Sequence, residues 1–254
     1  MTLQALVWDV DGTLAETEDE GHRIDFNLAF EEAGLPWRWD SSVYGELLRV
    51  TGGKERLLAW WRRIDPVSAD LPEAGATIRR LHELKTAHYL ALLRGGAIAL
   101  RPGVQALIEE ARRQGLRQAI ATTTTPENVT WLLEMTLGAV ASRWFEVIGA
   151  GDMVPHKKPA PDIYLWVLER LALPAADCLA IEDSAAGARA ARAAALPVVV
   201  TRSRYSAEED VGSVLADLSG LGEAATTARG TVRGQAWSGA VDLDTLRHWH
   251  GSYG

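Results

Sequence analysis

Five short apolar segments, separated by stretches with helical spacing, most constrain the fold of this chain. The segments are residues 3–8, 117–122, 145–149, 178–181 and 197–201. They show no regular alternation of apolar and polar residues, which is typical of strands buried on both faces. Strand and helix patterns alternate from about residue 103 to 202. This order predicts an α/β fold, a doubly wound parallel (Rossmann-like) sheet with helices on both faces.

The predicted helices of this region begin at residues that favour helix starts. Thr125 precedes Pro126, which indicates Thr125 as the N-cap and Pro126 as the first helical residue. Pro161 opens a second helix, and Ser184 caps an alanine-rich third one. Strand and helix patterns therefore alternate through this region.

Residues 16–100 differ, because they contain helical patterns and no convincing strand. The patterns cover residues 26–33, 44–50, 54–64 and 75–93. We therefore predict a helical cap domain over residues 16–95, inserted into a Rossmann-like core of residues 1–15 and 96–254. Beyond residue 220, a Gly/Ala/Thr-rich tail leads into one predicted strand and a short helix over residues 230–250, where Trp237 and Trp249 are expected to pack.

Composition excludes several classes of partner. A net charge of −8 over 254 residues argues against binding to nucleic acid or to an anionic membrane. No apolar run approaches the roughly 18 residues that a membrane span needs. The N-terminus lacks the basic flank of a signal peptide, and the lone Cys178 lies in an apolar run. We expect a cytoplasmic monomer.

Two carboxylates directly follow the first predicted strand, in the run Asp9-Val-Asp11-Gly-Thr. Ligands bind at the carboxyl ends of parallel strands, so this pair suits a nucleophile and a hard cation. An acidic turn without function is the alternative, because Asp and Gly favour turns. A calcium loop is disfavoured because Leu14 stands where such a loop needs glycine.

Three further groups of polar residues follow the later strands. The loop of Thr122, Thr123 and Thr124 leads into a helix N-terminus that could hold a phosphate, or could simply cap the helix. Lys158 lies in a proline-bracketed loop, although most lysines are solvated. Glu182 and Asp183 end a strand, where acids also favour the following helix dipole.

These groups can converge on one edge of the sheet, because each follows a predicted strand. Together they provide acidic metal positions, a hydroxyl-rich anion loop and a fixed cation. Such a set is typical of phosphoryl transfer, in which positioning and charge neutralisation supply most of the catalysis. Mg²⁺ is the expected cofactor, because it accepts few carboxylates and keeps water and phosphate oxygens as other ligands.

The four groups, in this order, resemble the motifs of the haloacid dehalogenase superfamily over residues 3 to about 205. The resemblance implies that Asp9 attacks phosphorus to form an aspartyl-phosphate and that Asp11 acts as acid and then base. It implies that Thr122 and Lys158 hold the transferring phosphoryl group. By the same resemblance, the Mg²⁺ ligands are Asp9, Asp183, the backbone carbonyl of Asp11, and Glu182 directly or through water.

Asp11 narrows the chemistry that the resemblance implies. Haloacid dehalogenases lack an acid at this position, and the phosphonate hydrolases of the superfamily have alanine there. The resemblance therefore points to phosphate esters, with either hydrolysis or mutase chemistry.

The predicted cap carries a second set of cations. Thr51, Gly52, Gly53, Lys54 and Arg56 lie at a turn before a helix, and Lys85 lies on another helix. The turn is not a nucleotide P-loop, because Leu48 and Glu55 occupy positions that need Gly and Ser or Thr. Solvated helix faces are one interpretation of these cations, and a second anion site for a substrate with two phosphates is the other.

The cap motifs, together with the runs 99–103, 121–125 and 151–154, resemble the CbbY family. That family dephosphorylates xylulose-1,5-bisphosphate to xylulose 5-phosphate, and the resemblance implies a small phosphorylated sugar as the substrate. It further implies that Lys54, Arg56 and Lys85 hold the distal phosphate and that Glu18 reaches sugar hydroxyls. Two departures stand out in this sequence. Trp8 replaces the usual Phe before the nucleophile, and we expect this change to affect packing only. His22 lies one residue later than the family pattern predicts relative to Glu18, so no role is assigned to it.

Other functions stay open at this point. A phosphomutase like β-phosphoglucomutase shares the fold, the cap and the aspartate pair. The substrate could also be another small sugar phosphate or phosphoglycolate. A sensor that binds a sugar phosphate without turnover is a third class, although the set of Asp9, Asp11, Lys158 and Asp183 argues against it.

Overall fold

The computed structural model describes residues 2–223 and 225–252. One eight-stranded sheet has the order β3-β2-β1-β4-β5-β6-β7-β8. The strands are β1 Ala5–Trp8, β2 Arg117–Ala121, β3 Val147–Gly149, β4 Cys178–Glu182, β5 Val198–Thr201, β6 Ala216–Leu218, β7 Ala228–Val232 and β8 Gln235–Gly239. Neighbouring strands from β3 to β6 are parallel, which confirms the predicted parallel sheet.

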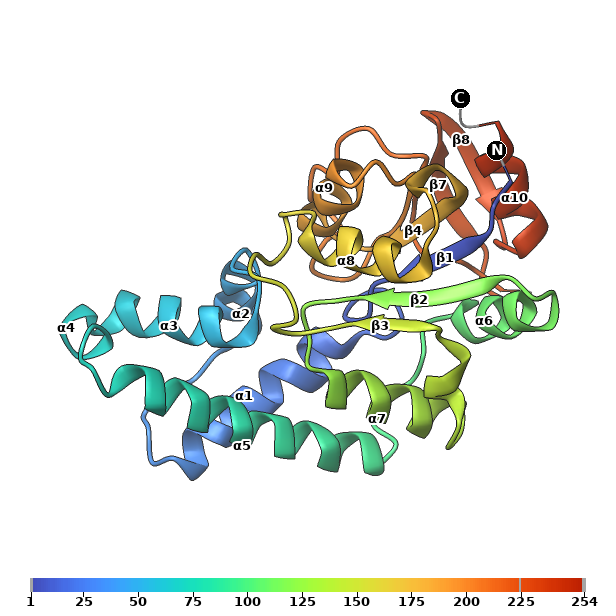
Figure 1. Cartoon of the computed structure of the whole chain (residues 1–254). Helices are drawn as coiled ribbons and strands as arrows, with labels where there is room; N and C mark the ends of the chain where they lie inside the picture. Colours follow the sequence, from blue (N-terminus) through green and yellow to red (C-terminus); the bar gives the residue numbers. More distant parts are fainter. Residues whose placement is uncertain (1, 224, 253–254) are drawn as a thin grey trace. The chain divides into compact units, whose positions relative to one another are not determined.

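Helices cover both faces of this sheet, as predicted. Figure 1 shows α8 and α9 on one face and α6 and α7 on the other. The helices of this part are α6 Val104–Arg113, α7 Pro126–Leu137, α8 Asp162–Leu171, α9 Ala185–Ala193 and α10 Leu243–Gly251, with 3₁₀ turns at Ala141–Trp144 and Ala175–Asp177. Both predicted N-caps are confirmed, because Thr125 Oγ1 accepts from Asn128 N at 3.3 Å and Ser184 Oγ accepts from Gly187 N at 3.1 Å.

The C-terminal part of the sheet differs from the prediction of a single tail strand. It contains the short strand β6 and the antiparallel hairpin of β7 and β8. The hairpin turns at Arg233 and Gly234, whose φ values of 52° and 74° suit a tight hairpin turn. Its strands are largely exposed, so they lack the continuous apolar run by which the central strands were found. The expected packing of Trp237 and Trp249 is confirmed, with ring centroids 5.1 Å apart.

The chain divides into two compact units, residues 1–16 with 99–254, and residues 17–98. The second unit consists of a π-helical turn Glu18–His22 followed by α1 Arg23–Glu32, α2 Ser41–Leu47, α3 Gly53–Ile64, α4 Pro66–Ala69 and α5 Ala74–Arg94. Its interior is aromatic: Trp39 lies with its ring centroid 4.7 Å from that of Phe26 and 4.9 Å from that of Phe30. These fully buried rings give the helical unit an apolar core of its own.

Trp8 does more than fill space at the end of β1, contrary to the expectation that it affects packing only. It is fully buried, and its Nε1 donates to Gln118 Oε1 at 3.2 Å. Gln118, on the neighbouring β2, in turn donates from Nε2 to the carbonyl of Ile108 at 3.1 Å. The indole therefore supplies a hydrogen-bond donor to the buried amide oxygen of Gln118.

We expect Trp8→Phe to lower the free energy of unfolding by about 1–3 kcal/mol, because Gln118 Oε1 loses its donor in the core. Urea denaturation of the variant measures this loss. The further change Gln118→Leu should recover part of it, since the polar group left unsatisfied is then gone. If Trp8→Phe unfolds at the same urea concentration as the wild type, the hydrogen bond makes no contribution.

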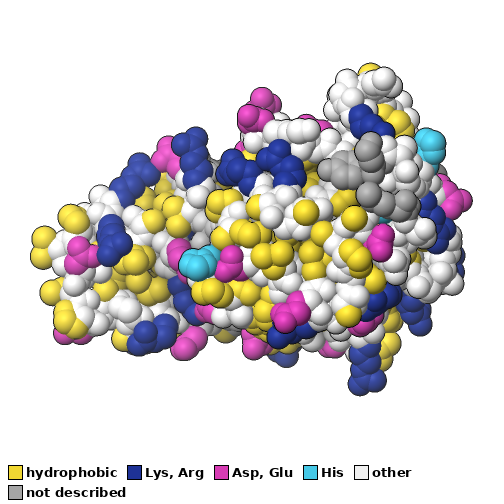
Figure 2. Space-filling view, turned by 45° about the horizontal axis from the view of Figure 1, so that its top comes forward, with side chains coloured by type: hydrophobic (Ala, Val, Ile, Leu, Met, Phe, Trp, Pro, Cys, Tyr) yellow, Lys and Arg dark blue, Asp and Glu magenta, His cyan; other side chains and the backbone are white. Residues whose placement is uncertain are grey.

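None of the described helices combines the length and apolar character that a membrane crossing would require. On the face seen in Figure 2, acidic side chains are interspersed among the basic ones.

Candidate active site

The register of the central strands brings three chain positions to one level at the carboxyl edge of the sheet. Trp8 at the end of β1 pairs with Ile120 of β2 and with Ile181 of β4. The next residue on each strand is Asp9, Ala121 and Glu182, respectively. Parallel pairing therefore places the backbone of these three positions side by side. The amide of Asp9 continues the pattern by donating to the carbonyl of Ile181 at 2.9 Å.

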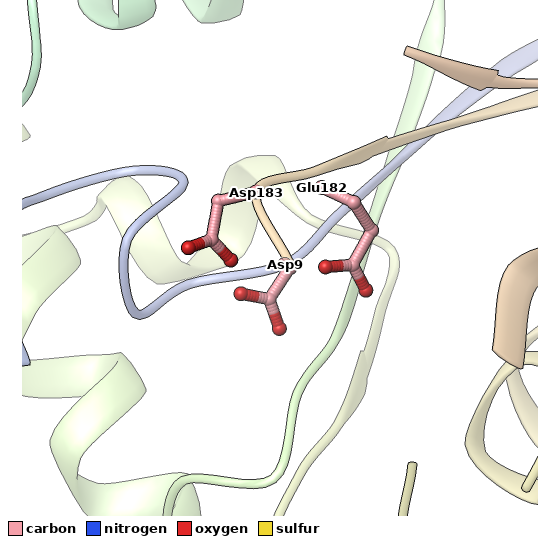
Figure 3. A group of neighbouring side chains, drawn as sticks. All are labelled: Asp9, Glu182 and Asp183. Atoms are coloured by element: carbon pink, nitrogen blue, oxygen red, sulfur yellow. The ribbon is translucent and has the colours of Figure 1, made fainter. Parts of the chain in front are cut away.

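Three buried carboxylates gather at this edge: those of Asp9, Glu182 and Asp183. Each offers one oxygen within 4.8 Å of the others, and Figure 3 shows them together where β1 and β4 end. Burial raises the pKa of Asp9 well above its usual value; Lys158 opposes the rise, and the charges of Glu182 and Asp183 add to it. A divalent cation would relieve this repulsion, and carboxylate oxygens are ligands that Mg²⁺ accepts, so the residues fit such an ion.

The loop after Asp9 approaches the same group of carboxylates. Gly12 has a φ of +82°, and a Cβ there would lie 2.3 Å from Asp183 Oδ2, so only glycine fits. Asp11 is half-buried in this loop, and its carboxylate is not part of the three-residue group found in the described chain. The role of Asp11 as the acid and base stays a prediction.

Lys158 links two of the three carboxylates. Its Nζ donates to Asp9 Oδ1 at 2.6 Å, to Glu182 Oε1 at 2.6 Å and to the carbonyl of Ala121 at 2.8 Å. Burial alone would lower the pKa of Lys158, but Asp9 and Glu182 outweigh burial and raise it. The ammonium is therefore charged, and these three acceptors use all its hydrogens. The alternative of a solvated surface lysine is wrong, since only 5% of Lys158 is exposed.

The threonine loop follows β2, one residue beyond the carbonyl that holds Lys158. Thr122 is buried, and its Oγ1 accepts from Thr124 N at 3.3 Å. Thr124 Oγ1 accepts in turn from the side chain of Asn128 at 3.2 Å. Thr123 and Thr124 are half-buried. The loop thus presents hydroxyls and amides before the N-terminus of α7, which is the chemistry that an anion site needs.

Sequence reasoning missed two residues that hold these side chains. Ser203 Oγ donates to Asp183 Oδ2 at 2.6 Å and lies 2.9 Å from Ser206 Oγ. Tyr164 donates from its hydroxyl to Glu182 Oε1. Ser203 could have been suspected, because it follows the carboxyl end of a predicted strand. Tyr164 carries no such signal, because it lies inside a helix.

The predicted cap cations lie in the helical unit, and two of them are buried there. Arg56 Nη1 donates to Tyr44 Oη at 2.7 Å and lies 3.6 Å from Glu18 Oε2. Glu18 also accepts from the Tyr44 hydroxyl. The interpretation of a solvated helix face is therefore wrong for Arg56, of which 7% is exposed.

Lys85 is also buried and meets a histidine to which no role was assigned. Its Nζ lies 2.7 Å from His22 Nδ1, and 5.1 Å from the ring centroid of Tyr89. An ammonium can only donate, so His22 Nδ1 is the acceptor in this contact. His22 is the last residue of the π-helical turn Glu18–His22.

Thr51, Gly52, Gly53 and Lys54 surround the start of α3. Gly52 has a φ of +98° and precedes the first helical residue, Gly53. Thr51 and Lys54 are half-buried. The turn therefore leads straight into a helix N-terminus, where backbone amides point out of the helix.

Comparison with known proteins identifies the family. A family model for haloacid dehalogenase-like hydrolases matches residues 3–195. Protein CbbY, plasmid, of Cupriavidus necator is 50% identical over 248 residues, which cover 98% of this chain and 97% of that protein. Protein CbbY of Rhodobacter capsulatus is 48% identical, over 90% of this chain and 98% of its own length.

Solved structures agree with this result. CbbY from Rhodobacter sphaeroides, in complex with phosphate, superposes with a TM-score of 0.76 at 45% identity, covering 84% of this chain and 92% of that one. A mutant of the same protein in complex with xylulose-(1,5)bisphosphate gives the same values. β-Phosphoglucomutase from Clostridium difficile superposes with a TM-score of 0.73 at 17% identity over 99% of this chain and 98% of that one, which shows the shared fold alone. The chain therefore belongs to the haloacid dehalogenase-like hydrolases, as a phosphatase of the CbbY family.

Proposed function

We propose that this protein is a Mg²⁺-dependent phosphatase that hydrolyses xylulose-1,5-bisphosphate to xylulose 5-phosphate through an aspartyl-phosphate on Asp9. The observation that carries the proposal is the buried set of Asp9, Glu182 and Asp183 around the charged Lys158. The substrate is inferred from the CbbY relative that was solved with xylulose-(1,5)bisphosphate at 45% identity.

Asp9 and Asp11 divide the chemistry between them. An oxygen of Asp9 forms a bond to phosphorus as the ester P–O bond breaks, and Asp11 gives its proton to the leaving sugar oxygen. Asp11 then takes a proton from water, which attacks phosphorus and releases inorganic phosphate and the free Asp9 carboxylate. The positive charge of Lys158, 2.6 Å from Asp9 Oδ1, favours the ionised form of Asp9 and opposes the effect of burial. Thr122 and its loop orient the phosphoryl oxygens.

The cation would be held by Asp9, Asp183, the backbone carbonyl of Asp11 and, directly or through water, Glu182. When bound, Mg²⁺ supplies positive charge that neutralises the phosphoryl oxygens and the crowded carboxylates. Ser203 fixes Asp183 for this role through its hydrogen bond to Oδ2.

The helical unit is proposed as the cap that selects the substrate. Lys54, Arg56 and Lys85 would bind the distal phosphate, and Glu18 would bind sugar hydroxyls. The support from the structure is that Arg56 and Lys85 are buried cations, each in contact with polar neighbours. Burying a charge costs desolvation free energy, which binding of an anionic substrate would offset. Thr51, Gly52 and Gly53 would add backbone amides at the start of α3.

We further propose that the protein works in the cytoplasm as a monomer, without a nucleic-acid or membrane partner. The support is its single buried cysteine and its net charge of −8.

The purified protein is expected to release inorganic phosphate from xylulose-1,5-bisphosphate in the presence of Mg²⁺. EDTA should abolish the release and added Mg²⁺ should restore it, because the three carboxylates lose their counter-charge without the ion. A coupled phosphate assay measures both results. Phosphate release that is unaffected by EDTA would contradict the cofactor, and no release from the bisphosphate would contradict the substrate.

Assays of product formation and binding with other sugar phosphates separate the rivals. Conversion of β-glucose 1-phosphate to glucose 6-phosphate, without phosphate release, would favour a phosphomutase. Phosphate release only from phosphoglycolate or another small sugar phosphate would identify a different substrate and leave the proposed mechanism unchanged. Binding of sugar phosphates without turnover would favour a sensor.

A further inference from the structure

The carboxylate of Glu182 is confined on three sides. Its Oε1 accepts from Lys158 Nζ at 2.6 Å and from the Tyr164 hydroxyl. On another side lies Gly187 of α9, where an added Cβ would come 1.9 Å from Oε2. No described residue donates a hydrogen bond to Oε2. The two donors on Oε1 and the close backbone of α9 therefore decide how this fully buried side chain is oriented.

Tyr164 is the one of these neighbours that touches both members of the ion pair. Its ring centroid lies 5.1 Å from Lys158 Nζ, and its hydroxyl donates to Glu182. The side chain is fully buried, on the first turn of α8, directly after the proline-bracketed loop that carries Lys158. One residue thus packs against the cation and hydrogen-bonds the anion, and α8 fixes its position.

A carboxylate shared between one lysine and nothing else could rotate about its last torsion, because such torsions are broad. The Tyr164 hydroxyl removes this freedom by adding a second donor at the same oxygen. Hydrogen bonds to groups around a metal site commonly fix the direction of the ligand and strengthen it.

We propose that Tyr164 is a positioning residue of the active site, whose hydroxyl orients Glu182 between Lys158 and the cation site. The inference rests on the proposed function, because it assigns Glu182 a role toward Mg²⁺. It adds a residue from the first turn of a helix to a site otherwise built from strand ends and the loops that follow them.

Tyr164→Phe tests the proposal, because it removes one oxygen and keeps the ring against Lys158. Thr136→Val is a matched control: it removes a hydroxyl of the same unit, on α7, that donates only to the carbonyl of Leu132 among the interactions seen. Mg²⁺ binding to the substrate-free proteins is measured by titration calorimetry, and kcat and KM are measured with the bisphosphate.

We expect Tyr164→Phe to weaken Mg²⁺ binding by about 10- to 100-fold and to lower kcat at fixed sub-saturating Mg²⁺ by a similar factor. KM should change by less than about twofold, because the hydroxyl contacts no substrate. Thr136→Val should leave all three quantities unchanged. Gly187→Ala should act in the same direction as Tyr164→Phe, although alanine normally favours a helix, because its Cβ displaces Glu182.

Unchanged Mg²⁺ affinity and kcat in Tyr164→Phe would overturn the inference, and so would a loss confined to KM. The calorimetric comparison needs no substrate. If the wild type released no phosphate but Tyr164→Phe still bound Mg²⁺ more weakly, the proposed reaction would fail while the role of Tyr164 would stand. Absence of Mg²⁺ binding to the wild type would overturn both.

Discussion

Asp9→Asn is expected to lower the rate of phosphate release by at least about 10⁴-fold, because the variant lacks the oxygen anion that attacks phosphorus. The amide keeps the size of the side chain, so the loss reports chemistry and not packing. Asp244→Asn is the matched control, since the side chain of Asp244 is 83% exposed on α10. It should keep full activity under the same assay.

The same variant is expected to be more stable than the metal-free wild type at neutral pH. The folded protein raises the pKa of Asp9, mainly through burial, so the fold favours the neutral form of this side chain. The neutral Asp9 side chain therefore contributes to the stability of the fold below its ordinary pKa of 3.8. This contribution is lost as the pH rises through the higher pKa that Asp9 has in the folded protein. Asparagine stays neutral and avoids that loss. Thermal unfolding of both proteins in EDTA at pH 7 tests the expected gain in stability. An unfolding midpoint lower for Asp9→Asn than for the wild type would contradict the conclusion that the fold favours neutral Asp9.

Lys158→Met is expected to reduce the free energy of unfolding by about 3–5 kcal/mol and to abolish activity. Asp9 and Glu182 would remain buried without the cation that now bonds to both. Urea denaturation of the metal-free proteins measures the stability loss. The phosphate assay, run on the variant under folded conditions, measures the activity separately.

Lys157 offers a matched control one residue away. Its Nζ lies 3.0 Å from Asp152 Oδ1, and the side chain of that aspartate is 58% exposed. Lys157→Met should cost less than Lys158→Met, because the carboxylate it leaves is exposed to water and not buried. Equal losses for the two lysines would mean that the buried site of Lys158 has no special electrostatic role.

The central sheet and the main site residues could be predicted because both depend on local patterns. Continuous apolar runs identify β1 to β5, and the polar residues that matter come directly after several of these runs. Parallel pairing then brings Asp9 and Glu182 together without further information. Lys158 was found for a similar reason, since the prolines around it marked an unusual loop.

Several features of the site and core depend on contacts between residues that are distant in sequence. The hydrogen bond from Trp8 to Gln118 spans 110 residues, and nothing at position 8 alone predicts it. Tyr164 fits the apolar pattern of α8, and only the structure shows that its hydroxyl donates to Glu182.

The short β6 and the exposed hairpin of β7 and β8 bury too little continuous apolar sequence to be recognised as strands. His22 was left without a role because it lies one residue later than the family pattern predicts relative to Glu18, and its contact with Lys85 spans 63 residues.

Chemical trapping of the covalent intermediate tests the central claim most directly. The protein is mixed with Mg²⁺ and xylulose-1,5-bisphosphate, quenched during turnover and treated with borohydride, which reduces an aspartyl-phosphate to homoserine. Mass spectrometry of the N-terminal peptide is expected to find homoserine at position 9, and only when substrate was present. Homoserine at another aspartate, or active protein that never yields it at position 9, would contradict the assignment of Asp9 as the nucleophile.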